Sequence, residues 1–268
     1  MSQPRLSQND VEAAFGVSAT YLGSGTFGDT WCINGRAEKI LCGASFDPDR
    51  IDREIEALAR LGHPRVVKLF EVRPITVAGT GYVTMSFEYV PGTDAAATLT
   101  AGRSADPAEG RALLIGLLKA VDALHGVRVV HRDIKPANIV LRGGDWVDPV
   151  LCDFGLARVD DMTTITVYPA IVGTLAYMAP EQLAATRARK GADLWAIGVV
   201  VREALAGHHP FFGPGDAVNT QRLAQGPSPL PGGVDTDVVA VLDDLTAVHR
   251  HRRGTARSNL QRLGVQTP

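Results

Sequence analysis

The most specific chemical pattern in the sequence is the polar run His-Arg-Asp-Ile-Lys-Pro-Ala-Asn at 131–138, followed by an Asp-Phe-Gly triplet that begins at Asp153. Mg²⁺ prefers carboxylate and carbonyl oxygens together with phosphate oxygens and water, so Asn138 and Asp153 are candidate ligands of a nucleotide-bound metal. Asp133 can accept or orient the proton of an incoming hydroxyl. Lys135 can offset charge on a transferred phosphoryl group. Two oxygen ligands for a metal and a carboxylate able to orient a hydroxyl therefore occur close together in the sequence.

A glycine-rich turn, Gly-Ser-Gly-Thr-Phe-Gly, contains Gly23, Gly25 and Gly28 and lies between two strand-like runs. Missing side chains let backbone N–H groups approach phosphates closely. A dinucleotide-binding site would require a helix directly after the last glycine, whereas this sequence continues as strand and turn. Taken alone, the motif is equally compatible with a flexible hairpin tip.

Lys39 lies on the strand that returns from the glycine-rich turn, where its ammonium could reach the α- and β-phosphates of a nucleotide. In isolation it is equally compatible with an exposed strand lysine. Glu54 lies on the helix expected after this strand and could hold Lys39 by an ion pair, although alone it is a helix-surface carboxylate. The polar runs that follow in the sequence are what favour a functional role for this pair.

The elements that must position these residues change in character near Pro91-Gly92, from strand-rich to helical. Strands are expected within 20–42, with the Asn34-Gly35 dipeptide as a hairpin turn. A helix is expected over 48–61, where apolar residues recur at helical spacing. The other expected elements are a short helix within 1–17 capped by Ser7, extended runs at 65–72 and 81–90, and helices within 108–126, 192–207 and 237–245. A crevice between the two parts is the natural ligand site.

The polar runs at 131–138 and 153–155, with Ala179-Pro180-Glu181 after them, resemble the eukaryotic-type (Hanks-type) serine/threonine protein kinases, including their bacterial members. The resemblance implies an α+β, protein-kinase-like bilobal fold, with a small β-rich N-lobe carrying one main helix and a larger, mostly helical C-lobe. It implies the following domains: an N-terminal extension at 1–17 and a kinase domain at 18–265, divided into an N-lobe at about 18–90 and a C-lobe at about 91–265.

The resemblance also implies ATP and Mg²⁺ as cofactors, with Mn²⁺ as an alternative metal. The implied catalytic residues are Asp133, Lys135, Lys39 and Glu54, the metal ligands are Asn138 and Asp153, and the nucleotide-binding residues are Gly23, Gly25, Gly28, Thr30, Ala37, Lys39, Glu88, Val90 and Val140.

Several of these roles concern the adenine. Ala37 would cover the ring, Val140 would form the floor beneath it, and Glu88 and Val90 would bond it as a hinge. Phe87 would be the gatekeeper beside the hinge. Thr30 stands where a valine is usual, so apolar contact with the base is reduced and nucleotide binding weakened modestly.

Two residues are expected to support the site without touching substrate. Asp193 would brace the backbone of the His-Arg-Asp run, and Arg253 would pair with Glu181. Loss of either should unfold the C-lobe before it affects chemistry.

The acceptor is expected to be a serine or threonine of a protein, because Lys135 and Gly173-Thr174 resemble that branch. An aminoglycoside-type small-molecule kinase shares the His-x-Asp…Asn core but should lack the segment at 173–181, which resembles a groove for a peptide. Ala137 makes a simple preference for basic residues near the acceptor doubtful.

A regulatory loop is expected between Asp153 and Glu181. It offers Thr163, Thr164 and Thr166, and a phosphothreonine there could pair with the guanidinium of Arg132. We expect autophosphorylation at Thr166 or Thr164. The alternative is that these threonines only keep a loop polar.

The main rival from another class is a pseudokinase, a binding or scaffold module that works by contact. Every catalytic position is filled, which argues against it. A toxin-like or defence kinase is a narrower form of the main hypothesis, and the sequence does not decide between the two. The sequence is also compatible with a regulatory partner.

The net charge and the cysteine content of the sequence indicate which binding partners and which compartment to expect. The net charge of −2 and pI near 6.4 give no basic field for nucleic acid or an anionic membrane. Three scattered cysteines form no disulfide framework, which favours the cytoplasm. The N-terminus has no apolar core of signal-peptide type, and the longest apolar run, at 194–201, is too short to span a membrane.

Overall fold

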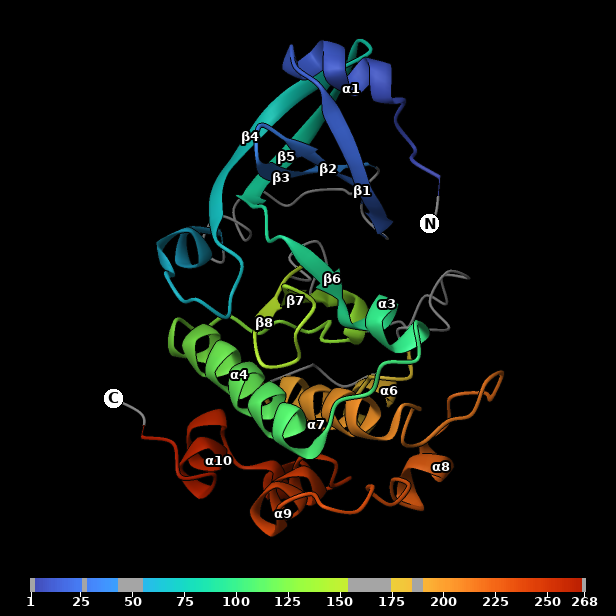
Figure 1. Cartoon of the computed structure of the whole chain (residues 1–268). Coiled ribbons are helices and arrows are strands. Elements are labelled where there is room, and N and C mark those ends of the chain that lie inside the picture. Colours follow the sequence, from blue (N-terminus) through green and yellow to red (C-terminus); the bar gives the residue numbers. More distant parts are fainter. Residues whose placement is uncertain (1–2, 26–27, 43–54, 154–174, 185–189, 267–268) are drawn as a thin grey trace. The chain divides into compact units, whose positions relative to one another are not determined.

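The computed structural model describes residues 3–25, 28–42, 55–153, 175–184 and 190–266 (Figure 1). They form two compact units. The N-terminal unit comprises the described residues of 1–62 and 67–90, and the C-terminal unit those of 63–66, 91–155 and 160–268.

The N-terminal unit is built on a five-stranded antiparallel sheet with the order β1-β2-β3-β5-β4. Its strands are β1 Ala19–Gly25, β2 Gly28–Ile33, β3 Arg36–Leu41, β4 Leu69–Val77 and β5 Thr80–Glu88. Asn34 and Gly35 join β2 to β3 with φ angles of 50° and 73°. These positive values are those of the tight hairpin turn predicted from the Asn-Gly dipeptide.

Two predicted elements of this unit differ from the structure or lie partly outside it. The extended run expected at 65–72 is replaced by a strand that starts later, at Leu69, and continues through Pro74. Because β4 is an edge strand, a proline without an N–H group is tolerated there. Of the helix predicted over 48–61, residues 55–60 are helical, and 48–54 lie outside the described residues.

A short helix, α1 (Gln8–Phe15), packs on one face of this sheet. Ser7 caps its first turn by accepting the N–H of Asp10, so the predicted N-cap is confirmed. Val11 is fully buried and packs with Trp31, Ile33 and Ile40, among other apolar residues. The helix therefore shares the core of the N-terminal unit.

The C-terminal unit is mainly helical (Figure 1). Its helices are α3 Ala95–Thr100, α4 Pro107–Gly126, α6 Pro180–Leu183, α7 Lys190–Ala206, α8 Thr220–Ala224, α9 Thr236–Leu245 and α10 Ala256–Arg262. Short 3₁₀ turns η1 Pro136–Asn138 and η2 Arg250–Arg253 are added. Strands β6 Gly92–Asp94, β7 Ile139–Arg142 and β8 Pro149–Leu151 form a small antiparallel sheet.

Helix α7 forms the centre of this unit. It is apolar around most of its circumference, as expected for a helix covered on all sides, and its buried residues include Leu194, Trp195, Val199 and Leu205. Helices α4 and α9 both pack on it. Asp193 and Arg202, two charged residues on α7, are therefore buried and need partners.

Candidate active site

Three predicted site residues form one hydrogen-bonded cluster in the C-terminal unit. The Lys135 ammonium donates to Oδ2 of Asp133 at 3.0 Å. The Asn138 amide nitrogen donates to the backbone carbonyl of Asp133 at 2.7 Å and to its Oδ2 at 3.1 Å. The turn η1 holds the last residue in place, because the N–H of Asn138 donates to the carbonyl of Lys135 at 2.9 Å. The Asp133 carboxylate is thus fixed by two different donors.

Asp193 of α7 supports this loop from within the core. It is 1% exposed and accepts the backbone N–H groups of His131 at 3.0 Å and Arg132 at 2.9 Å. The ring of His125, on α4, contacts the same carboxylate at 2.8 Å. The predicted bracing contact is confirmed, since a buried carboxylate is stable only when such donors surround it. His125 was not predicted, because a single histidine on a helix carries no signal of its partner.

His131 connects the loop to the end of β8. Its Nε2 lies 3.0 Å from the carbonyl of Cys152, and its Nδ1 lies 3.3 Å from the N–H of Asp133. Burial lowers the pKa of His131, although Asp193 and Asp133 favour its charged form. The ring is therefore neutral, with Nε2 donating and Nδ1 accepting.

The two predicted metal ligands lie at the same end of the β7–β8 ladder. Ile139 and Leu151 are paired, and the N–H of Cys152 donates to the carbonyl of Asn138 at 2.9 Å. Asp153 follows with a φ of 58°, an uncommon backbone for a residue with a side chain. Since the Asn138 nitrogen is directed at Asp133, its amide oxygen is the side-chain atom able to ligate a cation.

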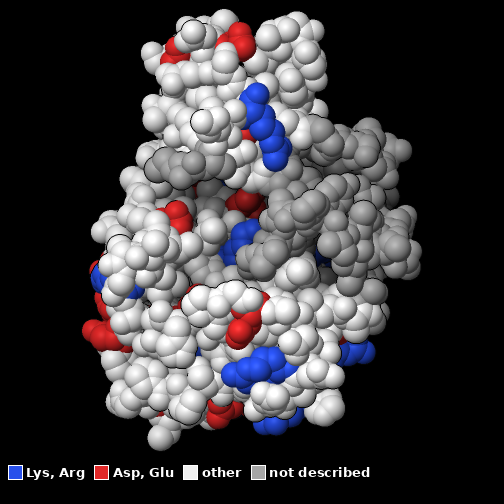
Figure 2. Space-filling model, turned by 90° about the vertical axis from the view of Figure 1, so that its right-hand side faces the viewer, with Lys and Arg blue, Asp and Glu red and all other residues white. Residues whose placement is uncertain are grey.

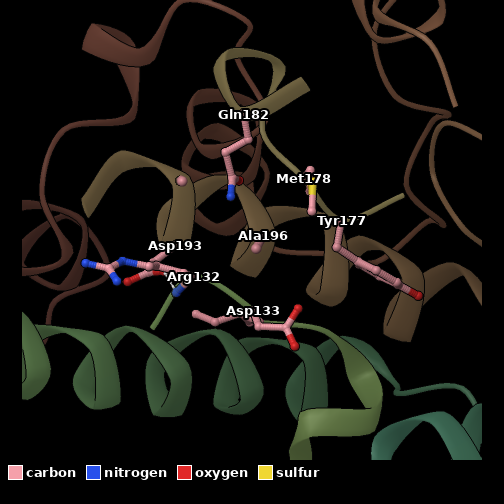
Figure 3. A pocket seen from close by; sticks show the side chains of 9 residues that line it. Arg132, Asp133, Tyr177, Met178, Gln182, Asp193 and Ala196 are labelled. Carbon is pink, nitrogen blue, oxygen red and sulfur yellow. Dashed lines mark hydrogen bonds between the residues drawn. The ribbon is translucent and has the colours of Figure 1, made fainter. Parts of the chain in front are cut away.

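A small pocket lies beside this cluster (Figure 3). Figure 3 shows Asp133 on one side and Tyr177, Met178 and Gln182 on the other, with Ala196 of α7 between them. The full lining consists of Arg132, Asp133, Ile134, Tyr177, Met178, Gln182, Ala192, Asp193 and Ala196. The segment before α6 is therefore placed next to the predicted base.

Partly buried polar groups hold that segment on α7 and on the residues just after it. The Tyr177 hydroxyl donates to Oε2 of Glu203 at 2.6 Å. Burial raises the pKa of both groups, most strongly that of Tyr177. His209 lies 3.2 Å from the carbonyl of Ala176 through Nε2, and burial lowers its pKa to about 4.

Arg253 and Glu181 form the predicted ion pair, in bidentate geometry. The two guanidinium nitrogens lie 2.7 and 3.0 Å from the two carboxylate oxygens. Arg253 is fully buried and also donates to the carbonyls of Gly191, Ala247 and Val248, with its guanidinium 5.0 Å from the ring centre of Trp195. This arginine joins α6, α7 and η2.

Three predicted nucleotide residues of the N-terminal unit, Thr30, Ala37 and Lys39, share one face of its sheet, whereas Glu88 is paired with Arg36 and points to the other face. Lys39 is paired with Thr30 on β2 and Met85 on β5, and Ala37 is paired with Cys32 and Phe87. Directly opposite residues point to the same side of a sheet. Trp31 and Ile40 point to the other side, where α1 packs. Lys39, which is 9% exposed, therefore lies on the face opposite α1.

Gly23 and Gly28 of the turn differ in how much room their surroundings leave for a side chain. A Cβ at Gly28 would lie 1.9 Å from the carbonyl oxygen of Ile40, so the backbone of β3 alone excludes a side chain there. A Cβ at Gly23 would have no heavy atom within 4 Å. Of Gly23 and Gly28, it is Gly23 that leaves open space beside the backbone.

The remaining predicted nucleotide residues lie in both units. Val90 is 8% exposed, and the N–H of Glu88 donates to the carbonyl of Lys68 at 2.8 Å, all in the N-terminal unit. Val140 is on β7 in the C-terminal unit. Glu54, Gly173-Thr174 and the threonines Thr163, Thr164 and Thr166 lie outside the described residues.

The side of the surface that Figure 2 displays has no large patch of a single charge among its described residues. There, the described Lys and Arg side chains and the Asp and Glu side chains form small groups among uncharged residues. In the described part of the chain, no helix is both long and apolar enough to cross a bilayer.

Comparison with known proteins identifies the family. Residues 19–263 match the family described as "Protein kinase domain". Because this match spans most of the 268 residues, the chain belongs to the protein kinase family. The predicted family and its bilobal α+β fold are confirmed.

Curated relatives carry serine/threonine kinase names. The chain is 31% identical over 204 residues to "Probable serine/threonine-protein kinase PknB" of Corynebacterium glutamicum, which covers 75% of this chain and 30% of that protein. A probable serine/threonine-protein kinase of Streptomyces coelicolor is 32% identical over 197 residues, with 72% and 29% covered. "Calcium/calmodulin-dependent protein kinase type 1" of Macrobrachium nipponense is 34% identical over 170 residues, with 63% and 47% covered. The chain thus spans less than half the length of these relatives.

Proposed function

We propose that this chain is an active serine/threonine protein kinase that transfers the γ-phosphoryl group of Mg-ATP to a hydroxyl of a protein. The observation that carries the proposal is the cluster of Asp133, Lys135 and Asn138, held on a loop braced by Asp193. General bases need this kind of fixed orientation, because a carboxylate that rotates freely seldom meets the hydroxyl proton.

The donor set fits a nucleotide-bound Mg²⁺. Asn138 and Asp153 offer oxygen ligands, which suit an ion that takes its other ligands from phosphates and water. We assign Asn138 and Asp153 to the metal, with Mn²⁺ as an alternative. ATP is assigned to Gly23, Gly25, Gly28, Thr30, Ala37, Lys39, Glu88, Val90 and Val140. Glu54 is assigned as the ion-pair partner of Lys39.

In the proposed reaction, the acceptor oxygen bonds to the γ-phosphorus while the bond to the β–γ bridging oxygen breaks. ADP leaves, and the hydroxyl proton moves to Asp133. Lys135 lies 3.0 Å from that carboxylate and offsets charge on the transferred group. Mg²⁺, when bound, neutralises charge on the phosphates.

The substitution Asp133→Asn tests the proposal. Transfer of labelled phosphate from ATP to a generic protein acceptor should fall about 10³-fold, because the amide cannot take the proton. Binding of a fluorescent ATP analogue should persist. Asp145→Asn, at an exposed loop position, is the matched control and should leave transfer unchanged. A wild-type chain that binds nucleotide but never transfers phosphate would instead be a pseudokinase.

The acceptor and the regulation follow from the same site. Residues 177–182 beside Asp133 support a protein acceptor rather than a small molecule. We further propose autophosphorylation at Thr166 or Thr164, supported by Arg132 in the same loop as Asp133. Phosphosite mapping of the active wild type against Asp133→Asn should find the modification only in the wild type. An active protein without phosphate at 160–172 would contradict it.

The proposed setting is the cytoplasm, with a kinase domain at 18–265 divided near 90. The family match at 19–263 and the division of the two units at Val90 support these bounds. All three cysteines are free thiols in the structure, as a reducing compartment favours.

A further inference from the structure

The glycine-rich turn is attached to residues that precede the matched kinase domain. Asp29, directly after Gly28, is 0% exposed. Its Oδ2 accepts the backbone N–H groups of Arg5 at 2.6 Å and Leu6 at 3.0 Å. Its Oδ1 accepts the Ser24 hydroxyl at 2.7 Å. One carboxylate therefore joins both arms of the turn to the N-terminal segment.

The side chain of Arg5 makes a second connection to the turn. Its Nη2 donates to the backbone carbonyl of Gly25 at 2.8 Å. Gly25 and Gly28 are the last paired residues of β1 and β2 before the turn closes. Arg5 thus contacts the β1 arm through its guanidinium and the β2 arm through its backbone.

The segment that carries Arg5 is itself fixed to the sheet. Val11 of α1 is buried in the core of the N-terminal unit. Oε1 of Glu12 accepts the N–H of Ala19, the first residue of β1, at 3.0 Å. The guanidinium of Arg73, on β4, lies 5.2 Å from the ring centre of Phe15. In Figure 1 the chain runs beside β1 from near its Gly25 end up to α1.

These contacts matter for a turn that binds phosphates. A turn that is disordered before binding loses its conformational entropy when the nucleotide arrives, and affinity falls accordingly. A buried carboxylate retains its donors, because leaving it without them is costly. The Asp29 contacts therefore fix the two arms of the turn, at Ser24 and Asp29, before nucleotide binds.

We propose that Arg5 and Asp29 are positioning residues, and that the N-terminal segment, residues 5–15, holds the glycine-rich turn in the conformation that binds ATP. This inference rests on the proposed kinase function. It makes the affinity for nucleotide, rather than the chemical step, depend on residues that lie outside the family match.

The test compares Arg5→Ala, Arg5→Lys and Arg73→Ala in the full chain. Arg5→Ala should raise KM for ATP about fivefold, the loss expected for one charge-assisted hydrogen bond partly exposed to water, with kcat changed by less than about twofold. The Kd of a fluorescent ATP analogue should rise in parallel. Arg5→Lys keeps a cationic donor and should return KM to within about twofold of wild type. Arg73→Ala removes one partly exposed contact with α1 but leaves Val11 buried and Glu12 bonded to Ala19, so the segment stays docked and KM should change by less than about twofold.

Asp29→Asn provides a second variant, because its amide keeps the shape but accepts more weakly, and it should raise KM at least as much as Arg5→Ala. Unchanged KM in both variants, in an enzyme that binds and turns over ATP, would overturn the inference and leave the kinase function standing. An equal rise in Arg73→Ala would overturn the assignment of Arg5 as a positioning residue, since docking of α1, and not the Arg5 contact with Gly25, would then set the affinity. A wild type that neither binds nor consumes ATP would overturn the proposed function itself.

Discussion

Two buried charges determine how the residues of the catalytic loop and its surroundings are held. Asp193 accepts hydrogen bonds from two backbone N–H groups of the loop. Arg253 donates hydrogen bonds to one carboxylate and to three backbone carbonyls. A buried ion contributes little net stability when paired, but its partner becomes costly when left alone. Loss of either group should therefore affect folding first, as expected from the sequence.

The substitution Arg253→Met checks this at the residue scale. It leaves Glu181 half-enclosed without its guanidinium, so the free energy of unfolding should fall by about 3–5 kcal/mol in urea titrations. Arg257→Ala is the matched control, because Arg257 is exposed and meets Asp122 at 3.3 Å. That surface pair should be worth less than about 1 kcal/mol. Similar losses in both variants would show that the buried pair has no special role.

Sequence reasoning was most complete for residues in continuous polar runs. Asp133, Lys135 and Asn138 were predicted together, and the structure brings them together within one turn. Asp29 was missed, although it directly follows the predicted turn. Its two partners in the N-terminal segment are the backbone N–H groups of Arg5 and Leu6, and every residue type except proline offers such a donor. Because such a contact does not depend on the type of the donor residue, it leaves no pattern in the sequence from which it could be predicted.

At the scale of elements, long apolar helices were predicted well and short strands were not. The helical pattern at 192–207 corresponds to α7 at Lys190–Ala206. Strands β6 and β8 have three residues each, which is too short for alternation to be visible. Their pairing with β7 depends on long-range contacts. Yet this small sheet positions Asn138 and Asp153 at one end.

Helix α7 packs on α9 through a glycine, which gives an element-scale prediction. A Cβ at Gly198 would lie 2.9 Å from side-chain atoms of Leu245 and Thr246 and 3.3 Å from the Leu245 carbonyl carbon. Gly198→Ala should therefore force the helices apart and cost about 1–3 kcal/mol of unfolding free energy. Gly191→Ala, in the same helix with nothing within 4 Å, should be neutral or stabilise by up to about 1 kcal/mol. Thermal and urea unfolding of the two variants measure the contrast, and a stabilised Gly198→Ala would contradict it.

At the scale of the molecule, burial of histidines should make the C-terminal unit sensitive to acid. Burial lowers the pKa of His63, His131 and His209, all of which belong to this unit. Each ring binds a proton more readily in the unfolded chain than in the folded one. Below the ordinary value of 6.5, the unfolded state therefore gains protons first, and stability falls as pH falls. Glu203 acts in the opposite sense, because burial raises its pKa and favours the folded state in acid.

His209 allows this prediction to be isolated. Its pKa of about 4 implies that it alone removes about 2 kcal/mol between pH 6.5 and 5, because each pH unit is worth about 1.4 kcal/mol. Gln at this position can still accept the N–H groups of Phe211 and Phe212, which the ring accepts at 3.2 Å, but it does not titrate. His209→Gln should thus lower stability at pH 7.5 yet lose about 2 kcal/mol less than wild type on moving to pH 5. Urea unfolding followed by tryptophan fluorescence suits the test, since Trp146 and Trp195 are both buried in this unit. Equal pH slopes for the two proteins would mean that burial does not hold His209 neutral in the folded state.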